Sequence, residues 1–372
     1  MRIAVPLEVK NGEYRVAITP TGVNELVRSG HEVAIQAGAG LGSSISDSEY
    51  EAVGAQILSD ADDVWAFGEL VIKVKEPEAE EYGRLRDDLV LFTYLHLASG
   101  PECTKALLSA GTTAIAYETV QLADGSLPLL KPMSEVAGCL APQVGAYHMT
   151  KPQGGRGVMM GGVGGVANAR VVILGAGVSG RMAANIAAGM GADVTLLDTN
   201  IEKLRDASWY WNGAVHQLAS NELTVREQVT AADLVIGSVL IPGARAPKLV
   251  PNDLVAQMKP GSVLVDIAID QGGCFEDSHP TTHDEPTFTV HQSIFYCVAN
   301  MPGAVPHTST YALTNATLPY VMRLADDGWR DAMVKDPALA LGLNTHGGQL
   351  TNAAVADSMG RDAVALQKVL GG

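Results

Sequence analysis

The sequence is poor in positive charge and has no long apolar run. Its 25 Lys and Arg residues face 41 Asp and Glu residues, which gives a formal net charge of −16 at pH 7. This balance argues against nucleic acid or an anionic membrane as a partner, so an anionic substrate must be bound by a few locally placed cations. The apolar runs are too short for a transmembrane helix or the core of a signal peptide. We therefore expect a cytoplasmic protein.

Cysteine and recognisable metal ligands are also scarce. The four cysteines, Cys103, Cys139, Cys274 and Cys297, lie far apart in the chain without a CxxC spacing. In a cytoplasmic protein such residues are expected to be buried thiols. Neither the cysteines nor the nine histidines follow a metal-ligand pattern. We expect no structural metal.

A glycine-rich turn stands in the middle of the chain. Residues 171–174, VVIL, are typical of a buried parallel strand, and Gly175, Gly177 and Gly180 follow in G-x-G-x-x-G spacing before an Ala-rich helical run. Another apolar strand, 192–197, leads to Asp198. This context predicts a dinucleotide site, with a packing turn of small residues as the alternative. Asp198 would accept hydrogen bonds from ribose hydroxyls and repel a 2′-phosphate, which favours NAD over NADP.

The order of predicted elements indicates two domains. Helix starts are marked by Thr19-Pro20 and by the capping box Ser46-x-x-Glu49, and these helices alternate with apolar strands through about residue 125. Two long helical stretches, 133–149 and 308–326, enclose the second domain, and nothing after residue 308 resembles a strand. The predicted fold is α/β, with two Rossmann-like domains with parallel-type sheets. We expect an NAD-binding domain of residues 129–306, inserted into a discontinuous catalytic domain of residues 1–128 and 307–372.

Four basic residues of the first domain could carry chemistry. Lys73 and Lys75 lie two apart and would share one face at the end of a predicted strand, 70–75, unless they are merely solvated. His96 ends the predicted strand 89–96, at the sheet edge where α/β folds place ligands, although it could equally be bonded to the backbone. Arg15 could bind a carboxylate with two parallel hydrogen bonds, or pair with Glu13 or another acid.

Two acidic residues interrupt the apolar run 263–270, and a loop rich in glycine precedes the nucleotide motif. Charged residues in such a strand are rarely buried without a partner. Asp270 lies at the end of the run and is the better functional candidate, whereas Asp266 could tie down a neighbouring loop. Residues 154–166 hold seven glycines in thirteen positions, which indicates a flexible loop.

Long strings along nearly the whole chain resemble the NAD-dependent L-alanine dehydrogenase family, shared with the alpha subunit of nicotinamide-nucleotide transhydrogenase. They include EYRVAITPTGV (13–23), LHLA (95–98), AYETVQ (116–121), PMSEVAG (132–138), VLVDIAIDQGGCFE (263–276) and VANMPGAVPHTSTYALTNATLPY (298–320). The resemblance implies reversible oxidative deamination of L-alanine to pyruvate and ammonia, with NAD as the hydride acceptor. It also implies a homohexamer whose catalytic domain is split.

The resemblance implies roles for single residues as well. Arg15 matches a substrate-carboxylate position, and Lys75 matches a substrate-binding lysine that also polarises the carbonyl or imine. His96 matches the catalytic proton donor and acceptor, and Asp270 the acid and base of the water and amine steps. Positions that match cofactor contacts are Ser134, Gly175, Gly177, Val178, Gly180, Asp198, Lys203, Ser220, Val239, Leu240, Ile267, Asp270, His279, Asn300 and Met301.

Three positions depart from the family pattern. His279 stands where relatives often carry arginine near the cofactor phosphates, so we expect NAD affinity to be weaker or pH-dependent. Pro142 stands in a connecting helix where alanine is usual, and it should kink that helix. Gly164 replaces a proline in the loop 154–166, which should make the loop more mobile.

The nearest alternative function is that of a transhydrogenase-type subunit, which binds NAD and has no amino acid substrate. The joint presence of Arg15, Lys75, His96 and Asp270 favours the dehydrogenase. A saccharopine-type dehydrogenase shares the lysine and histidine but none of the strings, and the same four residues disfavour a non-catalytic NAD-binding protein. The preference among alanine, glycine and glyoxylate stays open.

Overall fold

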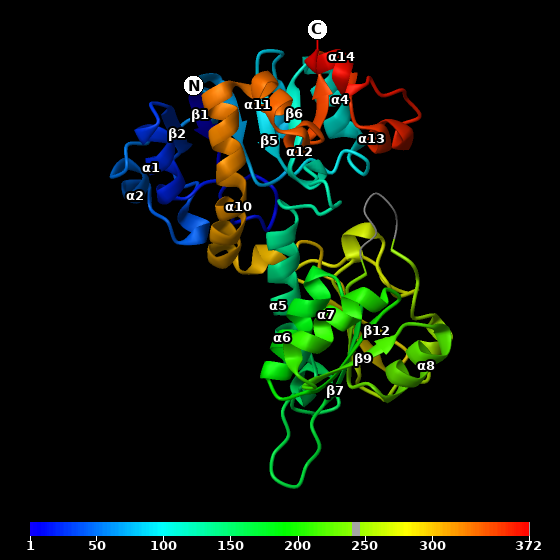
Figure 1. Ribbon diagram of the computed structural model, residues 1–372. Helices are drawn as coiled ribbons and strands as arrows, with labels where there is room; N and C mark the ends of the chain where they lie inside the picture. Colours follow the sequence, from blue (N-terminus) through cyan, green and yellow to red (C-terminus); the bar gives the residue numbers. More distant parts are fainter. Residues whose placement is uncertain (240–245, 372) are drawn as a thin grey trace. The chain divides into compact units, whose positions relative to one another are not determined.

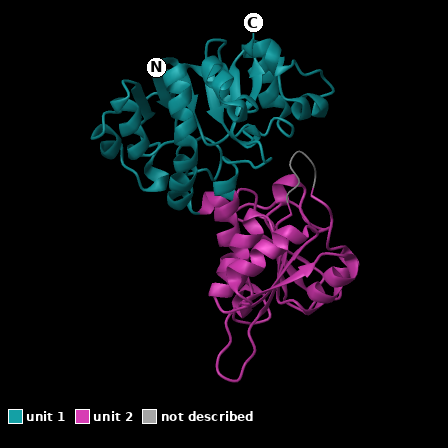
Figure 2. Ribbon diagram, in the orientation of Figure 1, with its two compact units in different colours: residues 1–133, 305–372 teal, residues 134–304 magenta. Residues whose placement is uncertain are grey.

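The computed structural model describes residues 1–239 and 246–371 (Figure 1). They form two compact units, called unit 1 and unit 2 below (Figure 2). Unit 1 is built from both ends of the chain, Met1–Met133 and Val305–Gly372, whereas unit 2 is the continuous stretch Ser134–Ala304. Within the described ranges, every helix is too short or too polar to serve as a membrane span.

The sheet of unit 1 has the strand order β15-β14-β6-β5-β4-β1-β2-β3, and the pairings among β1 to β6 are all parallel. These strands are β1 (Arg2–Val5), β2 (Glu32–Gln36), β3 (Gln56–Leu58), β4 (Leu70–Ile72), β5 (Val90–Thr93) and β6 (Thr113–Ala116). β14 (Leu343–His346) pairs antiparallel with β6 and with β15 (Gln349–Leu350). The prediction of no strand after residue 308 is therefore wrong. β14, LNTH, and β15, QL, each contain a single apolar residue, so neither has an apolar strand pattern.

The helices of unit 1 begin largely where their capping residues predict. The Thr19 hydroxyl accepts a hydrogen bond from the Gly22 amide at the start of α1, and Ser46 with Glu49 forms the expected capping box. The α-helices are α1 (Pro20–Arg28), α2 (Asp47–Glu51), α3 (Ala61–Phe67), α4 (Pro101–Ala110), α10 (Pro306–Asp327), α11 (Trp329–Lys335), α12 (Pro337–Ala340), α13 (Ala353–Ser358) and α14 (Leu366–Leu370). Short 3-10 helices are η1 (Leu41–Ser43), η2 (Ala79–Arg84) and η3 (Tyr117–Thr119).

The sheet of unit 2 has the order β12-β13-β11-β10-β7-β8-β9, parallel except for the pairing of β12 with β13. Its strands are β7 (Arg170–Leu174), β8 (Asp193–Asp198), β9 (Val215–Ala219), β10 (Leu234–Gly237), β11 (Val263–Asp266), β12 (Thr287–Val290) and β13 (Ser293–Tyr296). Helices here are α6 (Val178–Gly189), α7 (Ile201–Trp211), α8 (Glu222–Ala231), α9 (Asn252–Val255), η4 (Lys151–Gln153), η5 (Ile269–Gln271) and η6 (Met301–Ala304). The chain enters unit 2 along α5 (Lys131–His148), which continues past Pro142.

The parallel strands of the two sheets follow the same order relative to the sequence. The parallel strands run β3-β2-β1-β4-β5-β6 in unit 1 and β9-β8-β7-β10-β11-β13 in unit 2, the doubly wound order of Rossmann-like folds. The predicted fold class, α/β with two largely parallel Rossmann-like sheets, is confirmed. In such sheets the winding reverses beside the first strand, between β1 and β4 and between β7 and β10, and ligands bind outside the carboxyl ends of the strands there.

Candidate functional site

The candidate cofactor residues of unit 2 follow the carboxyl ends of its parallel strands. The glycine turn follows β7, Asp198 ends β8, and residues from later strands come from the same edge of the sheet. These later residues are Ser220 after β9, Val239 after β10, Ile267 and Asp270 after β11, and Asn300 and Met301 after β13. Ser134 lies on α5, Lys203 on α7 and His279 between β11 and β12, whereas Leu240 lies outside the described residues.

The glycine turn has the shape that a pyrophosphate site requires. Gly175 has a φ of 108°, in the left-handed region that favours glycine. A Cβ on Gly180 would lie 1.8 Å from the Gly175 carbonyl oxygen, so a larger residue cannot pack there. A Cβ on Gly177 would meet nothing within 4 Å, so the space beside the backbone is open at the N-terminus of α6, where Val178 begins the helix. Amide groups at such a terminus favour an anion.

Asp198 is joined to this turn and keeps acceptor capacity. Its carboxylate accepts hydrogen bonds from the amides of Ala176 at 2.7 Å and Asn200 at 2.8 Å, and the Lys203 ammonium lies 3.9 Å away. A carboxylate has more acceptor sites than these two amides use, so ribose hydroxyls can also bind it. The glycine turn and Asp198 therefore fit NAD.

Asp266 ties down the loop that carries Asp270. It is fully buried and accepts hydrogen bonds from the amides of Ala268 at 3.1 Å and Cys274 at 2.8 Å, and from the Ser278 hydroxyl at 2.6 Å. Burial raises the pKa of the Asp266 carboxyl, and these hydrogen bonds offset only part of that rise. The prediction that Asp266 ties down a neighbouring loop is therefore confirmed, whereas the functional role of Asp270, which is exposed in η5, stays a prediction.

The basic candidates of unit 1 likewise lie on segments that leave the carboxyl ends of parallel strands. Arg15 follows β1, Lys75 follows β4 and His96 follows β5. β1 and β4 are neighbours, and the winding of the sheet reverses between them. The strand order thus brings these three segments to one edge of unit 1, where α/β sheets bind their ligands.

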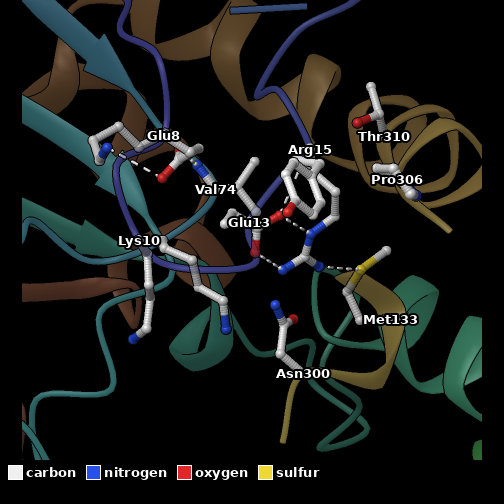
Figure 3. Close-up of polar contacts among 12 residues, drawn as sticks. Glu8, Lys10, Glu13, Arg15, Val74, Met133, Asn300, Pro306 and Thr310 are labelled. Atoms are coloured by element: carbon white, nitrogen blue, oxygen red, sulfur yellow. Dashed lines mark hydrogen bonds and ion pairs between the residues drawn. The ribbon is translucent and has the colours of Figure 1, made fainter. Parts of the chain in front are cut away.

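Arg15 is paired with Glu13, the alternative that the sequence left open (Figure 3). Its Nε donates to Glu13 Oε1 at 2.6 Å, its Nη2 to Oε2 at 2.5 Å, and its Nη1 to the Met133 sulfur at 2.9 Å. Burial acts to raise the pKa of Glu13, but the hydrogen bonds and charge of Arg15 outweigh it and lower that pKa to about 2. The Glu13 carboxylate thus fixes the orientation of the buried Arg15 guanidinium.

Lys73 does not share a strand face with Lys75. The predicted strand 70–75 is too long, because β4 ends at Ile72. The Lys73 side chain is fully buried, with its Nζ 3.1 Å from Glu8 Oε2 and 2.8 Å from Glu81 Oε1. Burial acts to lower the pKa of Lys73, but the two carboxylates outweigh it and raise that pKa. Lys73 is therefore a structural cation, and the half-buried Lys75 stays the candidate for a substrate.

His96 lies past the end of its strand, since β5 stops at Thr93. Its side chain is exposed, its φ is 48°, and its ring stacks on that of Tyr94 with centroids 5.8 Å apart. Its backbone amide donates to Glu118 Oε1 at 2.7 Å. The sequence left open that His96 is only bonded to the backbone at the sheet edge. In the structure it is the main chain of His96 that is held there by a hydrogen bond, while the imidazole projects outward.

Of the acidic partners of these residues, only Glu13 was named from the sequence, as one possible partner of Arg15. Glu8 and Glu81 hold Lys73, and Glu118 holds the backbone at His96. A signal existed only for Glu13, which stands two residues from Arg15, and for Glu118, which lies in the quoted string AYETVQ. Within the described ranges, no cluster of three or more His, Cys, Asp or Glu residues is arranged to hold a metal ion.

Comparison with known proteins identifies the family. Models of the N-terminal and C-terminal domains of alanine dehydrogenase/PNT match residues 4–137 and 141–353. The alanine dehydrogenase of Mycobacterium tuberculosis is 64% identical over 97% of this chain and 97% of its own length. A solved L-alanine dehydrogenase has a TM-score of 0.94 and 50% identity, over 97% of this chain and 99% of its own. A transhydrogenase from Sinorhizobium meliloti has a TM-score of 0.81 and 27% identity, over 95% and 100%. The chain belongs to the alanine dehydrogenase/PNT family, as its strings predict.

Proposed function

We propose that this chain is an NAD-dependent L-alanine dehydrogenase, which interconverts L-alanine with pyruvate and ammonia. The observation that carries the proposal is the set of Arg15, Lys75 and His96 on segments at one sheet edge of unit 1, in a chain 64% identical to an alanine dehydrogenase. The transhydrogenase alternative has less support. The solved transhydrogenase shares 27% identity with this chain, against 50% for the solved L-alanine dehydrogenase.

In this proposal unit 1 binds the amino acid. Arg15, oriented by Glu13, binds the substrate carboxylate, since a guanidinium matches carboxylate geometry. Lys75 binds the substituent on the α-carbon and polarises the carbonyl or imine. Two cations that bind different groups of the substrate hold it in one orientation, which lowers the entropic cost of reaching the transition state.

His96 and Asp270 are proposed to move protons. His96 exchanges a proton through its outward-facing imidazole as water adds to the imine and as ammonia leaves. Asp270, exposed in η5, serves the water and amine steps as acid and base. Positioned acid–base groups of this kind contribute about 10²–10⁴-fold in rate.

Unit 2 is proposed to hold the cofactor. We keep as part of the proposal the domain limits expected from the sequence, namely an NAD-binding domain of residues 129–306 and a catalytic domain of residues 1–128 and 307–372. Bound NAD supplies the acceptor for the hydride that leaves the substrate α-carbon. The glycine turn binds its pyrophosphate and Asp198 its ribose hydroxyls. The remaining proposed contacts are Ser134, Val178, Lys203, Ser220, Val239, Leu240, Ile267, Asp270, His279, Asn300 and Met301.

A homohexamer is part of the proposal. It rests on the resemblance to the family, and its test is the mass in solution by light scattering, which should be six times that of the chain. A monomeric mass for a fully active sample would contradict it.

The test of the activity is NADH formation with L-alanine, glycine and L-serine at alkaline pH, together with two variants. His96→Ala and Asp270→Asn are each expected to lower turnover by about 10²–10⁴-fold while NADH still binds, as followed by NADH fluorescence. Absence of turnover with all three amino acids would overturn the proposed function. Near-normal turnover in either variant would overturn only the role of that residue.

A further inference from the structure

The peptide of His96 is held on both sides by polar contacts. Its amide donates to Glu118 Oε1 at 2.7 Å, and the preceding Leu95 amide lies 3.2 Å from each Glu118 oxygen. Its carbonyl accepts from the Ser99 amide at 3.0 Å and the Gly100 amide at 3.1 Å. Glu118 reaches these amides from η3, after β6, which is the strand next to β5 in the sheet.

The conformation of His96 explains why such contacts are needed. Its φ of 48° is one that a residue with a Cβ rarely adopts and that costs about 1–3 kcal/mol in general. Leu95 and Leu97 on either side are buried, whereas His96 is exposed. The left-handed turn therefore directs one imidazole outward between two side chains that anchor the loop in the core of unit 1.

The hydrogen bonds of Glu118 stabilise the left-handed conformation of His96. Its carboxylate accepts from the amides of Leu95 and His96 and so fixes the peptide plane before His96, while the Ser99 and Gly100 amides fix the plane after it. Bonds from amides to an ionised acceptor are stronger than those to a neutral one. The Tyr94 ring, stacked on His96 at 11° between planes, then limits the directions that the imidazole can take.

We propose that Glu118 is a positioning residue that acts on the reaction through His96. It binds the backbone on either side of the Leu95–His96 peptide bond, keeps His96 left-handed and so fixes where the imidazole exchanges its proton. The inference rests on the proposed function, because it requires His96 to be the proton-transfer group. Glu118 itself need not touch substrate or cofactor.

A double-mutant cycle tests this role. Glu118→Ala in the otherwise unchanged enzyme is expected to lower kcat by about 10²-fold, the usual cost of misplacing a catalytic group by about an ångström. In a His96→Ala background the same change should lower the residual turnover by less than about twofold, because a residue that acts only through His96 has nothing left to position. Glu118→Gln, which keeps one acceptor oxygen, should recover part of kcat.

The control and the contrary outcomes separate this inference from the proposed function. Glu102→Gln removes the same charge from an exposed side chain on α4 and should leave kcat unchanged within about twofold. Equal losses from Glu118→Ala with and without His96 would overturn the positioning role while leaving the proposed function intact. Wild-type turnover in His96→Ala would overturn the positioning role together with the role of His96, whereas the proposed function fails only if none of the amino acids is turned over. If Glu118→Ala does not fold, the cycle is run with Glu118→Gln, and an unchanged kcat in that single variant overturns the inference.

Discussion

The pairing of Glu13 with Arg15 predicts a large, pH-dependent loss of stability when Glu13 is replaced by Gln. The Glu13 side chain is fully buried, and its pKa falls from an ordinary 4.5 to about 2. Each tenfold change in proton affinity corresponds to about 1.4 kcal/mol, so the ionised carboxylate stabilises the fold by about 3 kcal/mol at neutral pH. Because the folded pKa is the lower one, this contribution is complete above about pH 4.5. It is lost as the pH falls towards about 2.

The assay is urea unfolding of the wild type and of Glu13→Gln between pH 7 and pH 3, followed by far-UV circular dichroism. The difference in free energy of unfolding should be about 3 kcal/mol and constant from pH 7 to about pH 5.5, and should shrink at lower pH. The matched control is Glu25→Gln, an exposed acid 4.0 Å from Arg28, which should change stability by less than about 0.5 kcal/mol.

The same substitution has a functional readout. Without Glu13 the Arg15 guanidinium loses its orientation, so KM for L-alanine and for pyruvate should rise while NADH affinity is unchanged. A Glu13→Gln enzyme within about 1 kcal/mol of the wild type at pH 7 would refute the electrostatic reasoning. An unchanged KM in a destabilised variant would refute the orienting role alone.

Three other substitutions have defined outcomes. Lys73→Met leaves Glu8 and Glu81 buried without their cation and should lower the free energy of unfolding in urea by about 3–5 kcal/mol. The triple variant Glu8→Gln, Lys73→Met, Glu81→Gln should recover most of that loss. Equal losses of stability in the single and the triple variant would contradict this account. Gly180→Ala places a Cβ 1.8 Å from a carbonyl oxygen of the turn and should weaken NADH binding by roughly tenfold or more, as measured by fluorescence titration. His279→Arg adds a permanent charge at a proposed phosphate contact and should tighten NADH binding at pH 8, and weaker binding would exclude that contact.

Local signals predicted a good part of the fold. The capping residues Thr19 and Ser46 mark the starts of α1 and α2, and the glycine spacing marks the strand, turn and helix of the nucleotide motif. Each of these depends on neighbours within a few positions. The helical stretch expected from residue 308 begins two residues earlier, because Pro306 occupies the first helical position of α10.

What the sequence could not show depends on contacts between distant segments. The residues of β14 have no strand pattern of their own. They form a strand because Leu343 and Thr345 pair with residues of β6, which lie more than 200 positions earlier in the chain. Lys73 looks like a ligand-binding cation until Glu8 and Glu81 are seen to surround it. A periodic pattern reports which face of an element is buried, but it does not report which acid a buried cation meets.

The split of unit 1 between the two ends of the chain has a consequence for synthesis. Unit 2 is continuous in sequence, so it can fold while the ribosome is still translating residues 305–372. The sheet of unit 1 is complete only after β14 has been synthesised. The Arg15 loop likewise needs α10, whose Thr310 accepts a hydrogen bond from the Val16 amide at 3.1 Å. During translation a nascent chain should therefore gain the cofactor fold first and the fixed arginine last.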